Sequence, residues 1–213
     1  MITIAALSDL HGWFDYKEVY TEPELIIIAG DIFKSDYPGE QKKELPIFLE
    51  RMNEIFPKAD SMIICPGNHD FLIERDRNIL PGNIKLLIDS GYEYLSSTGE
   101  TLKIYGNPRT QTGLYAFQRK WNESDIKNIP RDLDILITHD SPRFYGLSCI
   151  RNSLGDYGFE EPGSKKLADH VLKVKPRIHI FGHIHKPCTW ENENTKFYNV
   201  SQIPTRKPVI LRA

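Results

Sequence analysis

Five short apolar runs constrain the fold of this chain more than any other feature of its sequence. Each run has the length of a β-strand, is rich in isoleucine, and is continuously apolar instead of alternating with polar residues. The runs are Ile2–Leu7, Leu25–Ala29, Met62–Cys65, Ile135–Thr138 and Ile178–Phe181. Continuous apolar strands are typical of sheets that are buried on both faces. The pattern therefore predicts an α/β fold.

Helical segments lie between these runs. Residues 44–56 and 165–174 carry apolar side chains at helical spacing, and Ser164 is placed to cap the second helix. Weaker β-structure is expected at about 84–105, and residues 186–213 resemble a meander of short strands. We expect one domain, residues 1–213, because no linker composition divides the chain.

Composition excludes several classes of protein. A net charge of −2 gives no strongly basic surface for duplex nucleic acid. No apolar run approaches the ~20 residues of a membrane span, so no membrane partner is expected. Three cysteines at unrelated spacings form no recognisable disulfide framework or Cys-x-x-Cys zinc site. They favour a reducing compartment, and hence a cytoplasmic location.

The residues that follow the five apolar runs are of the kinds that bind metals. They are Asp9 and His11, then Asp31, then Asn68, His69 and Asp70, then His139 and Asp140, then His183 and His185. In open α/β sheets the carboxyl ends of the strands line the ligand crevice. We therefore expect these side chains to converge on one point.

Their chemistry indicates a transition-metal site. Imidazole, carboxylate and amide oxygen are ligands for Mn, Fe, Zn, Ni or Co and do not resemble a calcium cage. Seven candidate ligands are too many for one tetrahedral zinc and suit two ions that share a bridging carboxylate. Taken singly, Asp-x-His and Gly-Asp are common turn sequences. The prediction depends on their recurrence after every core strand.

In this order, these motifs resemble the calcineurin-like metallophosphoesterase superfamily. The residues that carry the resemblance are Asp9-x-His11, Gly30-Asp31, Gly67-Asn68-His69-Asp70, His139 and Gly182-His183-x-His185. The stretches LKIYGNP, THDSP and PRIHIFGHIH are most similar to the small branch of MPPED-type phosphodiesterases. Some members of that branch have glycine where this chain has His183, so the histidine implies a complete two-metal site.

The resemblance implies a fold, a cofactor and a ligand set. The fold would be a four-layer α/β/β/α sandwich of two mixed β-sheets flanked by helices. The cofactor would be two divalent transition-metal ions, with the choice among Mn, Fe, Zn, Ni and Co left open. One ion would be held by Asp9, His11, Asp31 and His185. The second would be held by Asp31, Asn68, His139 and His183, so that Asp31 bridges the two.

The expected reaction is hydrolysis of a phosphoester. A hydroxide bridging the metals would attack phosphorus, and His69 would protonate the leaving group as a general acid. Asp70 would hold the other ring nitrogen of His69. The alternative is that His69 only shapes its turn. We expect His179, inside the last apolar run, to be a hydrogen-bonded buried imidazole and no ligand.

Substrate contacts are expected from the long loops at about 106–132 and 141–163, and from the first ligand loop. Arg109 and Arg143 would bind phosphate and Trp13 would stack on a base, although loop aromatics commonly anchor a loop to the core. The expected partner is a small phosphoester, with nucleotides and cyclic nucleotides included. Alternatives are a phosphomonoesterase or nucleotidase, a nuclease, and a non-catalytic scaffold of the same fold. The sequence leaves the oligomeric state open.

Overall fold

All five apolar runs form strands in the computed structural model. The model describes the chain except for residues 15–21, 112, 120, 123–125, 144–162 and 204. The strands are β1 (Thr3–Leu7), β2 (Leu25–Ile28), β3 (Ser61–Ile64), β7 (Ile135–Thr138) and β8 (Ile178–Phe181). The prediction of these strands is confirmed, and only their ends differ. Most of the loop expected at 141–163 lies outside the described residues.

Six further strands complete two mixed sheets in the described part of the chain. They are β4 (Ile84–Leu86), β5 (Ser90–Leu95), β6 (Thr101–Asn107), β9 (Cys188–Glu191), β10 (Lys196–Asn199) and β11 (Val209–Arg212). The first sheet has the order β11-β1-β2-β3-β4, in which only β11 is antiparallel to its neighbour. The second has the order β5-β6-β7-β8-β10-β9, with antiparallel pairs at its two edges.

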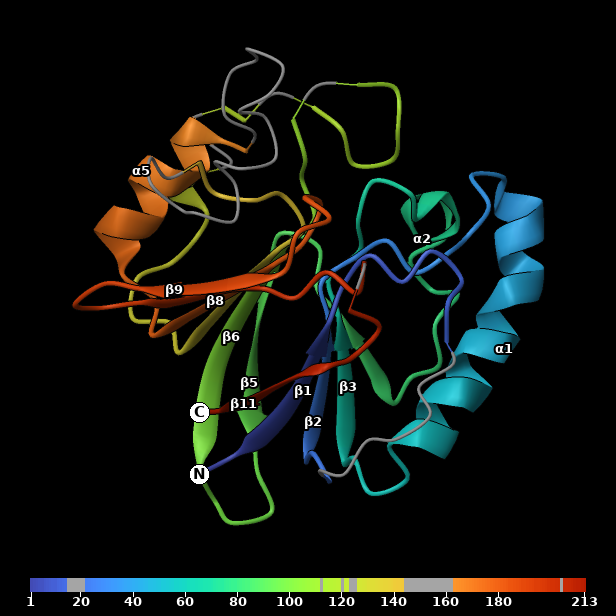
Figure 1. Cartoon of the computed structure of the whole chain (residues 1–213), viewed down its shortest axis with the longest axis horizontal. Helices are drawn as coiled ribbons and strands as arrows, with labels where there is room; N and C mark the ends of the chain where they lie inside the picture. The colour runs from blue at the N-terminus through green and yellow to red at the C-terminus, as the bar shows by residue number, and fades with distance from the viewer. Residues whose placement is uncertain (15–21, 112, 120, 123–125, 144–162, 204) are drawn as a thin grey trace.

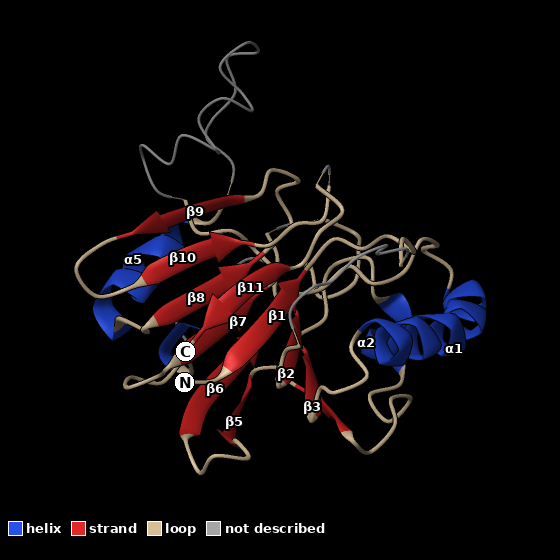
Figure 2. Cartoon of the chain, turned by 60° about the horizontal axis from the view of Figure 1, so that its bottom comes forward, coloured by secondary structure: helices blue, strands red, loops and turns tan. Residues whose placement is uncertain are grey.

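Helices cover the outer face of each sheet. Helix α1 (Pro38–Ile55) and the short α2 (Phe71–Arg75) lie on the first sheet, and α5 (Lys165–Val174) lies on the second (Figures 1 and 2). The start of α5 is as predicted, and the Ser164 hydroxyl caps it by accepting from the Leu167 amide at 3.2 Å. Helix α1 begins well before residue 44, because Pro38 has a fixed φ suited to a first helical turn.

Three apolar layers hold the sandwich together and confirm the expected four-layer architecture. The layer between the sheets includes Ile4 from β1, Ile27 from β2 and Ile180 from β8, all fully buried. The layer under α1 includes Phe48 and the other face of the first sheet. The layer under α5 packs that helix on the second sheet. Both faces of the central strands are buried, which explains why their sequences do not alternate.

Backbone hydrogen bonds position the end of β1 and the two termini. After β1, the Ser8 amide donates to the Val200 carbonyl at 3.1 Å and so joins the end of β1 to the segment that follows β10. The two termini lie together, with the Ile2 amide 3.0 Å from the Ala213 carbonyl (Figure 1). Among the described helices, none has the length and hydropathy needed to cross a bilayer.

The cysteines differ from the expectation of a fully reduced set. Cys65 is a buried free thiol, whereas Cys188 is disulfide-bonded. The cysteines therefore give no support to a reducing compartment, and the cytoplasmic location stays a prediction.

Candidate metal centre

The structure brings all seven predicted ligands together at the carboxyl ends of the central strands. Asp9, His11 and His185 form one group, and Asp31, His139 and His183 form a second. Within each group the potential ligand atoms all lie within 4.8 Å of one another. Asn68 joins the second group, because its side-chain oxygen lies 3.1 Å from His139 Nε2. The donor set of carboxylate, imidazole and amide oxygen suits transition metals.

Asp31 lies between the two groups. Its Oδ2 atom is 3.1 Å from His139 Nε2 in the second group and 3.8 Å from His11 Nε2 in the first. The first group is held by other short contacts, since His11 Nε2 lies 3.3 Å from His185 Nε2. A carboxylate that reaches both groups can serve two adjacent cations. The residues therefore fit a dinuclear centre, with Asp31 in the bridging position.

The backbone at the ligands is strained in a way that aims their side chains. Four ligand residues have positive φ angles: Asp9 (53°), His11 (44°), Asp31 (56°) and His183 (66°). This conformation costs a non-glycine residue about 1–2 kcal/mol. Hydrogen bonds between the loops hold it, with the Asp9 amide 2.9 Å from the Gly30 carbonyl and the His11 amide 3.0 Å from the Asp31 carbonyl. Strain of this kind collects at functional sites.

Glycines next to the ligands make room for them. A Cβ atom on Gly67 would overlap the Asp31 carboxylate, and one on Gly182 would overlap the Ser8 hydroxyl and the Asp9 carboxylate. The glycines of the Gly-Asn-His and Gly-His motifs are therefore explained by close approach to the ligands.

The buried carboxylates give the site a strong preference for positive charge. Burial opposes the charged form of His139, but the neighbouring Asp31 outweighs it and raises the pKa of His139 to about 10. Burial and the nearby His139 lower the pKa of His183 to about 4. Burial also opposes the charge on Asp31, yet His139 and the His69 amide keep its pKa below the ordinary value. A divalent cation would supply the positive charge that these carboxylates favour.

Asp70 does not hold the ring of His69, so that prediction is wrong. The Asp70 carboxylate is fully buried and accepts backbone hydrogen bonds from Asp31 at 2.9 Å, Ile32 at 2.9 Å and Gly67 at 2.7 Å. Two amides on separate loops, those of Asp31 and Gly67, thus meet on one carboxylate. Asp70 is a positioning residue that fixes the backbone on both sides of the second ligand group.

Asp36 occupies the place that the sequence assigned to Asp70. Its Oδ1 atom lies 2.6 Å from His69 Nδ1. The His69 ring lies beside the first ligand group, 5.0 Å from the His11 ring between centroids, and 4.8 Å from the ring of Tyr115. No spacing in the sequence signals the pair, because Asp36 lies in the loop before α1. The role of His69 as general acid stays a prediction.

The three predicted substrate contacts lie in different surroundings. Trp13 is 42% exposed, and the guanidinium of Arg206 lies 4.0 Å from its ring centre, a contact that the sequence did not reveal. The Arg143 amide donates to the Ser164 carbonyl at 3.1 Å, and the residues that follow it lie outside the described chain. Arg109 is only 3% exposed and lines a separate pocket whose described lining includes no metal-ligand candidate.

Sequence similarity to known proteins extends over most of this chain. The profile of the family described as calcineurin-like phosphoesterase matches residues 2–187. A UPF0046 protein of Caenorhabditis elegans is 31% identical over 224 residues, which cover 94% of this chain and 75% of that protein. Human metallophosphoesterase domain-containing protein 1 is 27% identical over 244 residues, which cover 96% of this chain and 69% of that protein.

A probable rhamnogalacturonate lyase C of Emericella nidulans is 25% identical over 202 residues. That match covers 87% of this chain and only 17% of the lyase, so the chain corresponds to a small part of that relative.

Solved structures show the same fold at low sequence identity. A Thermus thermophilus protein matches with a TM-score of 0.60 at 12% identity, over 99% of this chain and 98% of that one. The phosphopantetheinyl hydrolase of Mycobacterium tuberculosis matches with a TM-score of 0.56 at 15% identity, over 93% of this chain and 88% of that one. These likenesses support the two-sheet sandwich and add nothing about substrate.

Proposed function

Because this chain belongs to the calcineurin-like phosphoesterase family, we propose that it is a metal-dependent phosphodiesterase that hydrolyses small, nucleotide-type phosphoesters. One observation carries the proposal. Side chains from five separate strand ends meet in two ligand groups, and the Oδ2 atom of Asp31 reaches a histidine of each group. This arrangement supports two divalent ions side by side, which suits in-line displacement at phosphorus.

The chain supplies one set of ligands for each ion. Asp9, His11, Asp31 and His185 would hold the first, and Asp31, Asn68, His139 and His183 the second. When bound, two such ions stabilise charge on the phosphoryl oxygens and make water a nucleophile near neutral pH. The identity of the ions is part of the proposal, with Mn, Fe, Zn, Ni and Co all compatible with these donors.

His69 is the proposed general acid. Asp36 accepts from Nδ1 at 2.6 Å and fixes the orientation of the ring. Nε2 is then the nitrogen that can pass a proton to the leaving-group oxygen. The His69 amide also donates to Asp31 Oδ1 at 2.8 Å, which ties the acid to the bridging ligand. The carboxylate of Asp36 therefore acts as a positioning group for His69.

Aromatic side chains beside the metal ligands support a substrate with planar groups. Tyr115 is 44% exposed and packs against the ring of His69, the proposed general acid. Trp13 is also exposed, two residues after His11, and Arg206 adds a positive charge at its ring. Exposed aromatic rings suit stacking on a base, and a guanidinium suits phosphate. These contacts favour nucleotides, including cyclic ones, as the substrate class.

The test is a panel of phosphoesters with controlled metal content. Chelator-treated protein is supplied with Mn²⁺ or Zn²⁺ and assayed on bis(p-nitrophenyl) phosphate, p-nitrophenyl phosphate, and 2′,3′- and 3′,5′-cyclic nucleotides. We expect the diesters to be hydrolysed faster than the monoester, and chelator to abolish turnover. Faster hydrolysis of the monoester would make the protein a phosphomonoesterase, and turnover that survives chelation would contradict the metal mechanism.

The role of His69 has its own comparison. His69→Gln should lower turnover by about 10²–10⁴-fold while metal content stays unchanged. The loss should be larger for diesters whose leaving group is an alkyl alcohol of high pKa than for p-nitrophenyl esters. The p-nitrophenolate ion leaves readily without being protonated. His170→Gln, in helix α5, is the matched control and should leave turnover unchanged. An equal loss on both kinds of leaving group would contradict the general-acid role.

A further inference from the structure

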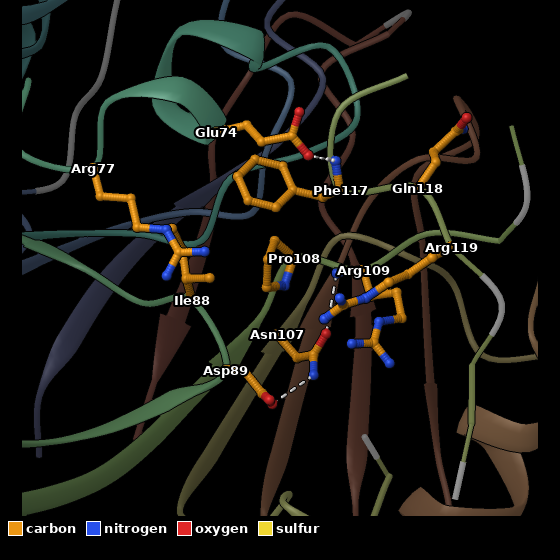
Figure 3. Close-up of a pocket in the computed structure, with 10 residues that line it drawn as sticks. All are labelled: Glu74, Arg77, Ile88, Asp89, Asn107, Pro108, Arg109, Phe117, Gln118 and Arg119. Carbon is orange, nitrogen blue, oxygen red and sulfur yellow. Dashed lines mark hydrogen bonds between the residues drawn. The ribbon is translucent and has the colours of Figure 1, made fainter. Parts of the chain in front are cut away.

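One polar pocket has no metal-ligand candidate among the described residues that line it. It is formed where the end of β6 meets residues 117–119, the end of α2 with the residues that follow it, and the turn between β4 and β5, and Figure 3 shows the side chains that line it. Its volume is about 150 Å³. Sites for drug-sized ligands begin at about 300 Å³. The pocket therefore suits a single small group and is too small for a whole nucleotide.

Three arginines line this pocket. Arg109 is 3% exposed, whereas Arg77 and Arg119 are exposed at its rim. Figure 3 shows the side chains of Arg109 and Arg119 extending toward each other, with Arg77 on the opposite side. Burial and the like charge of Arg119 lower the pKa of Arg109, but only to about 10, so the guanidinium stays charged at neutral pH.

The two acids that line the pocket are engaged by neutral donors. Asp89 accepts from the Tyr105 hydroxyl at 2.7 Å and from the side-chain amides of Asn107 at 2.9 Å and Asn128 at 3.1 Å. Glu74 accepts from the Phe117 amide at 2.6 Å. Each acid thus serves to hold the wall of the pocket. The pocket lining holds three arginines and two carboxylates, so positive charges outnumber negative charges by one.

Backbone hydrogen bonds hold residues 116–119 at the pocket. The Ala116 amide donates to the Asn68 carbonyl at 3.0 Å, and the Arg119 amide donates to the Thr110 carbonyl at 3.2 Å. Between them, Phe117 has a φ of 54°, a conformation that L side chains avoid. A non-glycine residue held in this conformation by its neighbours commonly marks a functional site. The hydrogen bond of the Arg119 amide sets where the Arg119 side chain leaves the backbone.

We propose that this pocket binds a free oxyanion of phosphate size between the guanidiniums of Arg109 and Arg119, with Arg77 at the rim. Guanidinium groups bind tetrahedral oxyanions through paired hydrogen bonds, and two of them brought close together are stabilised by an anion between them. The pocket volume fits one such anion. None of the described residues that line the pocket is a metal-ligand candidate, and the proposal does not rest on the proposed function.

The test is calorimetric titration of inorganic phosphate into chelator-treated protein, so that metal-bound phosphate makes no contribution. We expect saturable binding, weakened about tenfold or more in both Arg119→Gln and Arg77→Gln. Arg131→Gln is the matched control, since this exposed arginine does not line the pocket, and its binding should equal that of the wild type. Arg119→Lys keeps the charge without the paired donors and should fall between wild type and Arg119→Gln.

A local signal distinguishes this pocket from any other phosphate site. The Arg109 guanidinium lies 5.4 Å from the ring of Trp121, so the Trp121 indole N–H resonance should move during the titration. The proposal is overturned if the chelated protein binds no phosphate. It is also overturned if the arginine variants bind as the wild type does, or if binding disappears in Asp31→Asn and persists in Arg119→Gln. None of these results bears on turnover of phosphodiesters, which is measured separately.

Discussion

Replacing His179 by glutamine tests how a buried histidine outside the ligand groups affects stability. His179 lies in β8, fully buried, with Nε2 2.9 Å from the Thr138 hydroxyl. That hydroxyl donates its own proton to the Asp140 carbonyl at 2.7 Å, so the ring must donate to Thr138 through Nε2. Nδ1 is buried with no partner among the described residues, which suits a bare lone pair. The ring is therefore neutral, and it is the hydrogen-bonded buried imidazole that the sequence predicts.

The neutral ring makes stability depend on pH in a defined direction. Burial lowers the pKa of His179 from its ordinary value of 6.5 to about 3. Between these values the unfolded chain binds a proton at His179 and the folded chain does not. Stability therefore falls as the pH falls below 6.5. At about pH 5 the loss from this one group is about 2 kcal/mol in the free energy of unfolding.

The assay is urea unfolding of the wild type and His179→Gln at pH 7 and pH 5, with chelator present in every sample. Glutamine is neutral at both values, and its amide can still donate to the Thr138 hydroxyl. We expect the wild type to lose about 2 kcal/mol more than the variant between the two pH values. Equal losses would refute the reasoning, because they would mean that the folded protein admits the proton at His179.

Three further substitutions test the scaffold. Ser164→Ala removes the cap of α5 and should lower the free energy of unfolding by about 1 kcal/mol in urea titrations, whereas no change would deny the cap a role. Gly182→Ala places a Cβ against the Asp9 carboxylate and should reduce metal uptake, measured by mass spectrometry. Metal uptake equal to that of the wild type would contradict the close packing at Gly182. Trp121→Phe removes the indole donor that lies 2.9 Å from the buried Asp140 carboxylate and should cost about 1–3 kcal/mol. An unchanged thermal midpoint would show that another donor replaces it.

The central strands and the ligand candidates could be predicted because one physical pattern marks both. A strand buried on both faces needs a continuous apolar run, and its end is visible where a polar residue interrupts the run, as at Asp9 or His139. The start of α1 could not be predicted in the same way. Residues 39–44 carry no apolar periodicity, so the sequence shows that helix only from Leu45 onward.

Contacts between loops that are far apart in the chain could not be predicted from the sequence. The pairing of Asp36 with His69 depends on how the loop before α1 packs beside the Asn68–Asp70 loop, and adjacency in the chain pointed wrongly to Asp70. Arg109 carried a charge that suits phosphate, but its loop turns it into a separate pocket. The contact of Arg206 with Trp13 likewise joins segments that are far apart in the chain. Such contacts depend on tertiary packing, which local patterns do not encode.

The most direct test of the two-metal account is a count of bound ions. Chelated protein is reconstituted with Mn²⁺ or Zn²⁺, freed of excess metal, and measured by mass spectrometry against protein concentration. We expect two ions per chain in the wild type and in His170→Gln, one for each ligand group. Asp31→Asn should lose most of both, because its carboxylate serves the two groups together. A wild type that retains no metal, or an Asp31→Asn variant that retains two ions, would contradict the account.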